Sequence, residues 1–192
     1  MAFEVGVNLG FVIDTPIADP DEDDTIPVDG GIYACRHIAP PGAYQITELG
    51  WWQDDGANDA ANYNMGVYDD DTNTPGSLIA TQESGQATTA NTAGWYKYTG
   101  LTITVTPYTT YWIGLAIEAV AGANRLPVAG NPWCTGLAYH WGTGAPPTLS
   151  DPFVSGGSNE NISFSIYAKY DAHLNLPLVG NRMGGGCNSM KA

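Results

Sequence analysis

Short runs in which every second residue is apolar recur along this chain, and clusters rich in Gly and Pro separate them. A period of two places alternate side chains on opposite faces of a strand, whereas a helix needs apolar residues three and four positions apart. The run 161–170 is a clear case, with one apolar face made of Ile162, Phe164, Ile166 and Ala168. No amphipathic helical stretch with convincing caps accompanies these runs. The pattern predicts an all-β protein.

About eight short strands are expected, and this number favours a jelly-roll-like, two-sheet β-sandwich with extended N- and C-terminal arms. The expected strands cover 31–39, 44–53, 62–68, 77–81, 94–105, 110–117, 135–141 and 161–170. The run 110–117 is the most apolar, so we expect it at the centre of a sheet. The predicted division is an N-terminal strand or arm (1–13), an acidic Pro- and Asp-rich linker (14–30), the sandwich domain (31–170) and a C-terminal tail (171–192).

The N-terminal arm carries apolar side chains at odd positions, namely Phe3, Val5, Val7, Leu9, Phe11 and Ile13. The linker after it contains seven acids and neither Lys nor Arg. Like charges keep such a linker extended and solvated. An apolar strand beyond a solvated spacer needs a surface to cover its face, and we expect that surface on another subunit. The tail resumes the alternation with Leu174, Leu176 and Leu178, and the same contact is expected for it.

The charge balance restricts the partners. The 192 residues include 20 acids and 6 bases, for a net charge of −14. Such a surface repels nucleic-acid backbones and anionic membranes, so neither is expected as a direct partner. The start of the chain lacks the pattern of a secretory signal, and no run approaches the ~20 apolar residues of a membrane span. The missing signal favours a particle protein over an exported filament.

Cysteine and acid spacings leave alternatives open. Cys35 and Cys134 either pair or remain buried thiols, and Cys187 in the Gly-rich tail is either a free thiol or a cross-link between subunits. Asp69, Asp71 and Asn73 have the spacing of a calcium loop. The EF-hand pattern would need Gly and Glu where this chain has Thr74 and Ala80, so a polar hairpin loop is the alternative. No other metal or cofactor is expected.

Residues that could carry catalysis form no motif. Most acids lie in turn or linker composition, the three histidines are isolated, and neither G-x-S-x-G nor a phosphate-binding loop occurs. We therefore expect no enzymatic activity. Trp133, Tyr139 and Trp141 border a loop-rich segment and are candidates for contact with a surface glycan or a subunit. Trp51 and Trp52 are adjacent, so in a strand they face opposite sides.

Several short motifs follow one another in the middle of the chain. They are Ile-Thr-Glu-Leu-Gly-Trp at 46–51, Met-Gly-Val-Tyr-Asp at 65–69, Thr-Pro-Gly-Ser-Leu-Ile-Ala at 74–80, Thr-Thr-Tyr-Trp-Ile-Gly at 109–114 and Ile-Tyr-Ala-Lys-Tyr at 166–170. In this order they resemble the choice-of-anchor type of β-sandwich domain, found in bacterial surface proteins and phage structural proteins. The resemblance covers roughly residues 31–170 and implies a non-catalytic module.

Together these features favour a non-catalytic structural subunit of a self-assembling particle or fibre. The expected setting is a phage or virus virion, as a capsid decoration, head fibre or tail component. The expected partners are copies of the chain itself and other structural subunits. The alternative is a carbohydrate-binding or adhesion module, or a subunit of an extracellular bacterial filament, with an extracellular or cell-surface location.

Overall fold

The computed structural model describes residues 10–20, 24–27, 30–54, 58–121, 125–130, 139–142, 145–156 and 162–172. These ranges contain twelve strands and no helix. The strands are β1 (Gly10–Val12), β2 (Asp24–Pro27), β3 (Ile32–Ile38), β4 (Ala43–Gln53), β5 (Asn62–Asp71), β6 (Thr74–Ala87), β7 (Gly94–Thr104), β8 (Thr110–Ile117), β9 (Arg125–Gly130), β10 (Tyr139–Gly142), β11 (Ile162–Phe164) and β12 (Ile166–Ala172). A helix able to cross a membrane is accordingly not found in the described part of the chain.

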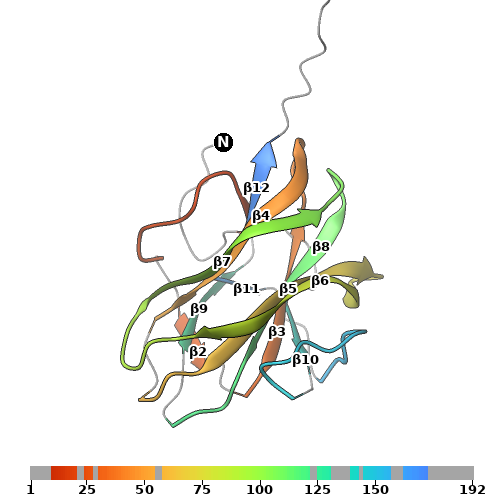
Figure 1. Ribbon diagram of the computed structural model, residues 1–192. Coiled ribbons are helices and arrows are strands. Elements are labelled where there is room, and N and C mark those ends of the chain that lie inside the picture. The colour runs from red at the N-terminus through yellow and green to blue at the C-terminus, as the bar shows by residue number, and fades with distance from the viewer. Residues whose placement is uncertain are drawn as a thin grey trace, which may run out of the picture.

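Two main sheets pack against each other, as Figure 1 shows. One sheet has the strand order β1-β12-β4-β7 and the other β10-β3-β8-β5-β6, and a small third sheet has the order β11-β9-β2. The chain crosses between the main sheets from β3 to β4, β4 to β5, β6 to β7 and β7 to β8, whereas β5 and β6 form a hairpin within one sheet. The predicted all-β, jelly-roll-like sandwich is confirmed.

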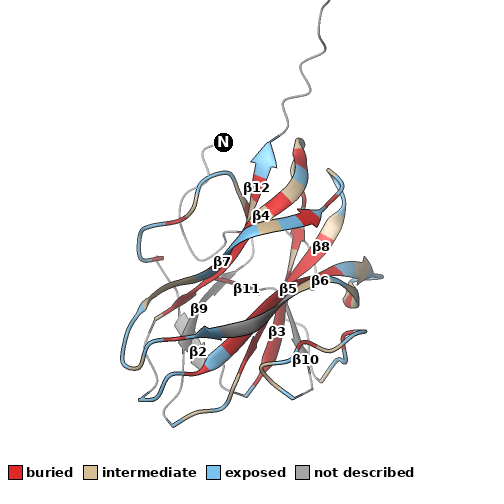
Figure 2. Cartoon of the chain, in the orientation of Figure 1, coloured by how far each residue is buried: buried red, intermediate tan, exposed pale blue. Residues whose placement is uncertain are grey.

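The hydrophobic core lies between the two main sheets. Alternate residues of β8 face it, beginning with Tyr111 and Ile113, because the side chains of a strand point to opposite faces in turn. Trp51 of β4 and Tyr63 of β5 meet across the interface with their ring centroids 5.7 Å apart. Figure 2 shows buried residues along β3, β4 and β8, the strands that hold this core.

The strands differ from the predicted runs in informative ways. β8 matches the run 110–117 and lies between β3 and β5, as predicted. The run 161–170 is broken at Ser165, because β11 pairs with β9 and β12 with β4. Phe164, Ile166 and Ala168 still face the core as predicted. The run 77–81 belongs to the longer β6.

A loop covers the outer face of the five-stranded sheet. Residues 145–156 place Leu149 and Phe153 over a second apolar cluster that includes Tyr68 and Trp112. The loop is fixed by hydrogen bonds from the Tyr68 hydroxyl to the Ser150 carbonyl (3.0 Å) and from the Phe153 amide to the Gly76 carbonyl (2.9 Å). This sheet is therefore apolar on both faces, which explains why β3 and β8 are buried along most of their length.

A charged cluster borders the same outer face. The Asp70 carboxylate accepts hydrogen bonds from Arg36 Nε at 3.1 Å and from the Trp112 indole Nε1 at 2.8 Å. The guanidinium also lies 6.0 Å from the centre of the Trp112 ring. The Arg36 and Asp70 side chains are only 16% and 19% exposed, so water contributes little to their solvation. Asp70 thus joins β3, β5 and β8 at the rim of this apolar face.

Replacement of Asp70 by Ala should lower the free energy of unfolding by about 2 kcal/mol, because the indole N–H and the guanidinium lose a shared, largely buried acceptor. Asp71→Ala is the matched control, since its neighbouring carboxylate is exposed, and it should change the free energy by less than about 0.5 kcal/mol. Urea denaturation at pH 7 measures both. Equal losses for the two variants would contradict this role of Asp70.

Candidate functional site: the slot of the first strand

The first strand closes one edge of the four-stranded sheet. β1 runs parallel to β12, with Gly10 opposite Tyr167, Phe11 opposite Ala168 and Val12 opposite Lys169. β12 pairs with β4 on its other side. The backbone edge of β12 that would otherwise be open is thus covered by a strand that precedes the predicted domain boundary.

Phe11 anchors this strand in the core. Its side chain is 4% exposed and meets Tyr111 and Tyr170 edge-on, with ring centroids 6.4 and 6.3 Å away. In this structure Phe11 packs within its own domain, where it fills the gap beside β12, and contact of Phe11 with another subunit stays a prediction. Ile13 lies beyond the end of β1 and is 55% exposed, so the two residues do not share one buried face.

A buried histidine lies beneath the start of the strand. Gly10 has a φ of +57°, and a Cβ at this position would lie 2.4 Å from His37 Nδ1. His37 is 5% exposed, and its Nε2 has no hydrogen-bond partner among the described residues. Burial lowers the pKa of His37 to about 4, so the imidazole is neutral at pH 7. The alternation of the sequence could have predicted the burial of His37. It follows the core residues Tyr33 and Cys35 at every second position of the same strand.

The chain after β1 crosses the outer face of the four-stranded sheet. Lys169 Nζ donates to the Thr15 hydroxyl at 3.2 Å, and the Trp95 indole Nε1 donates to the Ala18 carbonyl at 2.8 Å. Pro16 and Pro20 are buried. The linker is thus held on the sandwich at Pro16 and Pro20 and is paired at β2 with β9, while residues 13, 14 and 17–19 are exposed as a solvated linker would be. The prolines supply apolar contact, while Asp14 and Asp19 are exposed.

An aromatic cluster lies on that outer face. Trp95 contacts Trp52 and Tyr167, with ring centroids 5.4 Å apart in each pair. The Tyr167 hydroxyl donates to the buried Glu48 carboxylate at 2.5 Å. Desolvation and this bond raise the pKa of Tyr167, which keeps the phenol neutral and able to donate. Trp51 faces the core, so the two adjacent tryptophans face opposite sides as predicted.

The candidate calcium residues lie in the β5–β6 hairpin. Thr72 and Asn73 form its two-residue turn with φ values of 52° and 72°, the left-handed geometry of a tight hairpin. Asp69 Oδ1 accepts a hydrogen bond from the Ser77 amide at 2.5 Å. Among the described residues, no group of three or more His, Cys, Asp or Glu side chains is placed to hold a metal ion. The geometry is that of the alternative hairpin loop.

Several other predicted residues lie outside the described residues. These are Phe3, Val5, Val7, Leu9, Trp133, Cys134, Leu174, Leu176, Leu178 and Cys187. Tyr139 and Trp141 lie on β10, which pairs with β3, but their side chains are not described. Contacts of these residues with a subunit or a glycan stay predictions. Cys35 is buried, and its sulfur accepts a hydrogen bond from the Phe164 amide at 3.2 Å.

Phe11→Ala should lower the free energy of unfolding by about 3 kcal/mol, because it removes the buried ring that fills the slot beside β12. Ile17→Ala is the control, since Ile17 is 91% exposed and its loss should cost less than about 0.5 kcal/mol. Chemical denaturation of the full chain measures both values. If Phe11→Ala is as mild as the control, the first strand is not held by this side chain.

Acid should destabilise the protein through His37. The pKa of His37 rises from about 4 in the folded state to its ordinary value of 6.5 on unfolding, so the unfolded chain binds the extra proton. This contribution is complete above pH 6.5 and is lost as the pH falls toward 4. Between pH 7 and pH 4.5, wild type should lose about 2 kcal/mol more than His37→Gln, which cannot titrate. Parallel pH profiles for the two proteins would contradict the prediction.

Comparison with known proteins identifies no relative. No family model, curated protein or solved structure matches this chain. The resemblance to choice-of-anchor domains stays a prediction. The seating of residues 10–20 on the sandwich is therefore the feature from which function is inferred.

Proposed function

We propose that this chain is a non-catalytic structural subunit of a self-assembling particle or fibre. In this proposal it is a phage or virus virion protein, such as a capsid decoration, head fibre or tail component. Its partners are copies of itself and other structural subunits. The choice-of-anchor resemblance of residues 31–170 supports the virion setting, since such domains occur in phage structural proteins.

The observation that carries the proposal is the way β1 is held. It is an edge strand with three register pairs to β12 and one buried aromatic anchor, Phe11. The slot is completed by His37, Tyr111 and Tyr170, none of which belongs to the arm. A β1 strand from a second copy would make the same contacts in the same slot. Exchange of an identical element between copies needs no new interface and is a low-cost route to assembly.

The charge of the chain is consistent with selective contacts. A net charge of −14 opposes nonspecific association between copies. A subunit of this charge needs a shaped apolar contact to associate, and a buried Phe in a backbone-paired slot is such a contact. The polar contacts of Thr15 and Ala18 then determine the path of the chain away from the slot.

Removal of residues 1–13 should abolish assembly, because it empties the slot and leaves the β12 edge without its donor. The measurement is mass by light scattering, against a single-copy mass of 20.3 kDa. The full chain should show a multiple of this mass, the truncated chain a single copy, and full-length Phe11→Ala a shift toward the single copy. Ile17→Ala should assemble as wild type does. Normal assembly of the truncated chain would contradict the proposal.

A further inference from the structure

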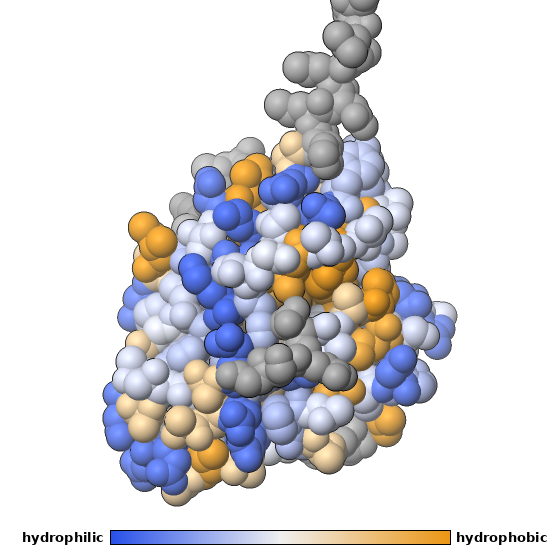
Figure 3. All heavy atoms as spheres, viewed as in Figure 1, coloured by the Kyte–Doolittle hydropathy of each residue, from blue (hydrophilic) through white to orange (hydrophobic). Residues whose placement is uncertain are grey.

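Three large apolar residues with exposed side chains lie near one end of the sandwich. They are Ile38 (55% exposed), Tyr44 (40%) and Tyr108 (74%), and we call them the end patch. Ile38 ends β3 and Tyr44 lies at the start of β4, and backbone hydrogen bonds join the turn between these strands to the turn that carries Tyr108. The Tyr108 amide donates to the Ala39 carbonyl at 2.8 Å, and the Val105 amide donates to the Tyr44 carbonyl at 3.0 Å. Figure 3 shows a few hydrophobic residues among hydrophilic ones at the surface toward this upper end, and its scale counts tyrosine as slightly hydrophilic, so the two tyrosines do not stand out in it.

The exposed ring of Tyr108 is carried by a backbone in a strained conformation. Its φ is 63°, in the left-handed region that disfavours bulky side chains by about 1 kcal/mol or more. Gly or Asn would make the same turn with less strain. The turn alone therefore does not account for an exposed aromatic ring here, whereas contact with another surface does. Tyrosine suits such a contact because it combines a rigid apolar ring with a polar tip.

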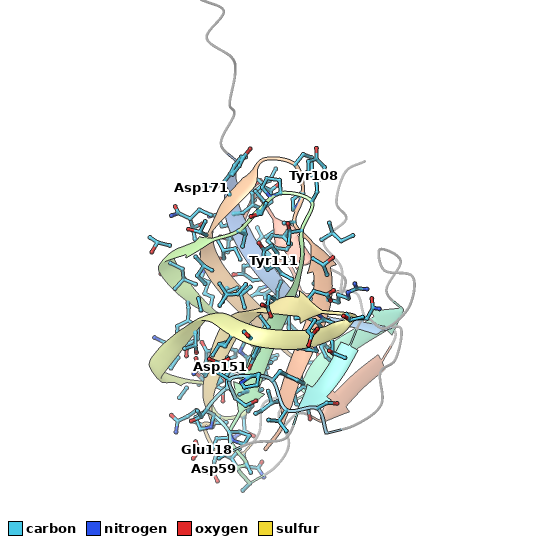
Figure 4. All side chains as sticks on the ribbon, turned by 90° about the vertical axis from the view of Figure 1, so that its right-hand side faces the viewer. Asp59, Tyr108, Tyr111, Glu118, Asp151 and Asp171 are labelled. Atoms are coloured by element: carbon cyan, nitrogen blue, oxygen red, sulfur yellow. The ribbon has the colours of Figure 1, made fainter. Side chains whose placement is uncertain are left out.

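The chain itself supplies an occupant at this end. β12 ends at Ala172, which pairs with Ala43 beside Tyr44. Figure 4 shows Tyr108 and Asp171 at the same end of the sandwich, opposite Asp59 and Glu118. The sequence after Ala172 has leucine at every second position, at 174, 176 and 178. Ala172, the last described residue before this apolar segment, thus lies beside a strand that carries part of the end patch.

The direction of β12 favours a second copy over the same copy. Figure 1 shows β12 pointing out of this end of the sandwich. An extended continuation, at about 3.3 Å per residue, would carry Leu178 about 20 Å beyond Ala172 and past its own end patch. If two copies face each other end to end about a two-fold axis, each continuation points toward the other copy's patch. Such an isologous contact is closed and self-complementary.

We propose that Leu174, Leu176 and Leu178 of one copy dock on the end patch of a second copy. This contact rests on the proposed assembly function and adds a second interface to it. The interface is distinct from the first-strand slot, because it uses the turns at 39–44 and 105–109 rather than the edge of β12. The partner it fits is an extended apolar segment of an identical chain.

Photo-cross-linking of the full chain tests the contact. Tyr108 is replaced by p-benzoylphenylalanine in unlabelled copies, which are mixed with ¹⁵N-labelled wild-type copies. Illumination should join position 108 to the labelled tryptic peptide 170–182, which contains all three leucines. The control places the same photo-reactive residue at Ile79, which is exposed on β6, and should give no such product. Links confined to one copy, or none to this peptide, would overturn the proposal.

Tyr108→Asn separates association from folding. Asn tolerates the positive φ, so the melting temperature should stay the same or rise, while association through the end patch weakens at least tenfold. Leu174, Leu176 and Leu178 changed together to Ser should weaken it equally, and Ile79→Ser should not. Undiminished association of Tyr108→Asn would overturn the proposal. The end-patch contact alone is too weak to hold two copies together at the concentrations used for light scattering, but Phe11→Ala leaves the patch intact. Illumination at high protein concentration should therefore still trap the position-108 cross-link in that variant, even if exchange of the first strand is disproved.

Discussion

The structure depends on the contact between the inner faces of its two main sheets. Trp51, Tyr63 and Tyr98 form the aromatic centre of that contact, with Tyr63 5.7 Å from Trp51 and 5.4 Å from Tyr98 by ring centroids. The Tyr98 hydroxyl donates to the Tyr63 carbonyl at 2.8 Å, so this ring also satisfies its polar atom. Because strand side chains alternate, a fixed inner face also determines which residues face outward. The two outer faces then carry Trp112 on one sheet and Trp52 with Trp95 on the other.

Both outer faces are covered by irregular chain rather than left to water. Residues 145–156 cover the five-stranded sheet, and residues 13–20 cross the four-stranded sheet. These covers differ in how they are held. The first has Leu149 and Phe153 buried together with backbone hydrogen bonds, whereas the second relies on Phe11, two prolines and two polar contacts. The second cover is therefore the simpler one to exchange between copies, and it leads directly from the first strand.

The sequence predicted the sandwich because its strands alternate clearly, and β8 and β7 appear almost where the pattern placed them. It did not predict the place of β1. The alternation at Phe11 shows that a face must be covered, but which sheet edge lies open depends on strand order, which periodicity does not contain. The sequence also did not predict the break at Ser165. The side-chain alternation continues through this residue, while the pairing partner changes from β9 to β4. In the linker, the acids led us to expect exposure to water. The charges do not indicate that Pro16 and Pro20 are buried.

The central claim is that the first-strand slot accepts β1 from a neighbouring copy when the protein assembles. An electron cryo-microscopy map of the assembled particle tests this most directly, because the chain can be traced from Val12 through residues 13–20 to its own β3. The account predicts that the β1 strand beside a given β12 connects to a different sandwich. A map in which every β1 connects to the sandwich whose slot it fills would contradict it.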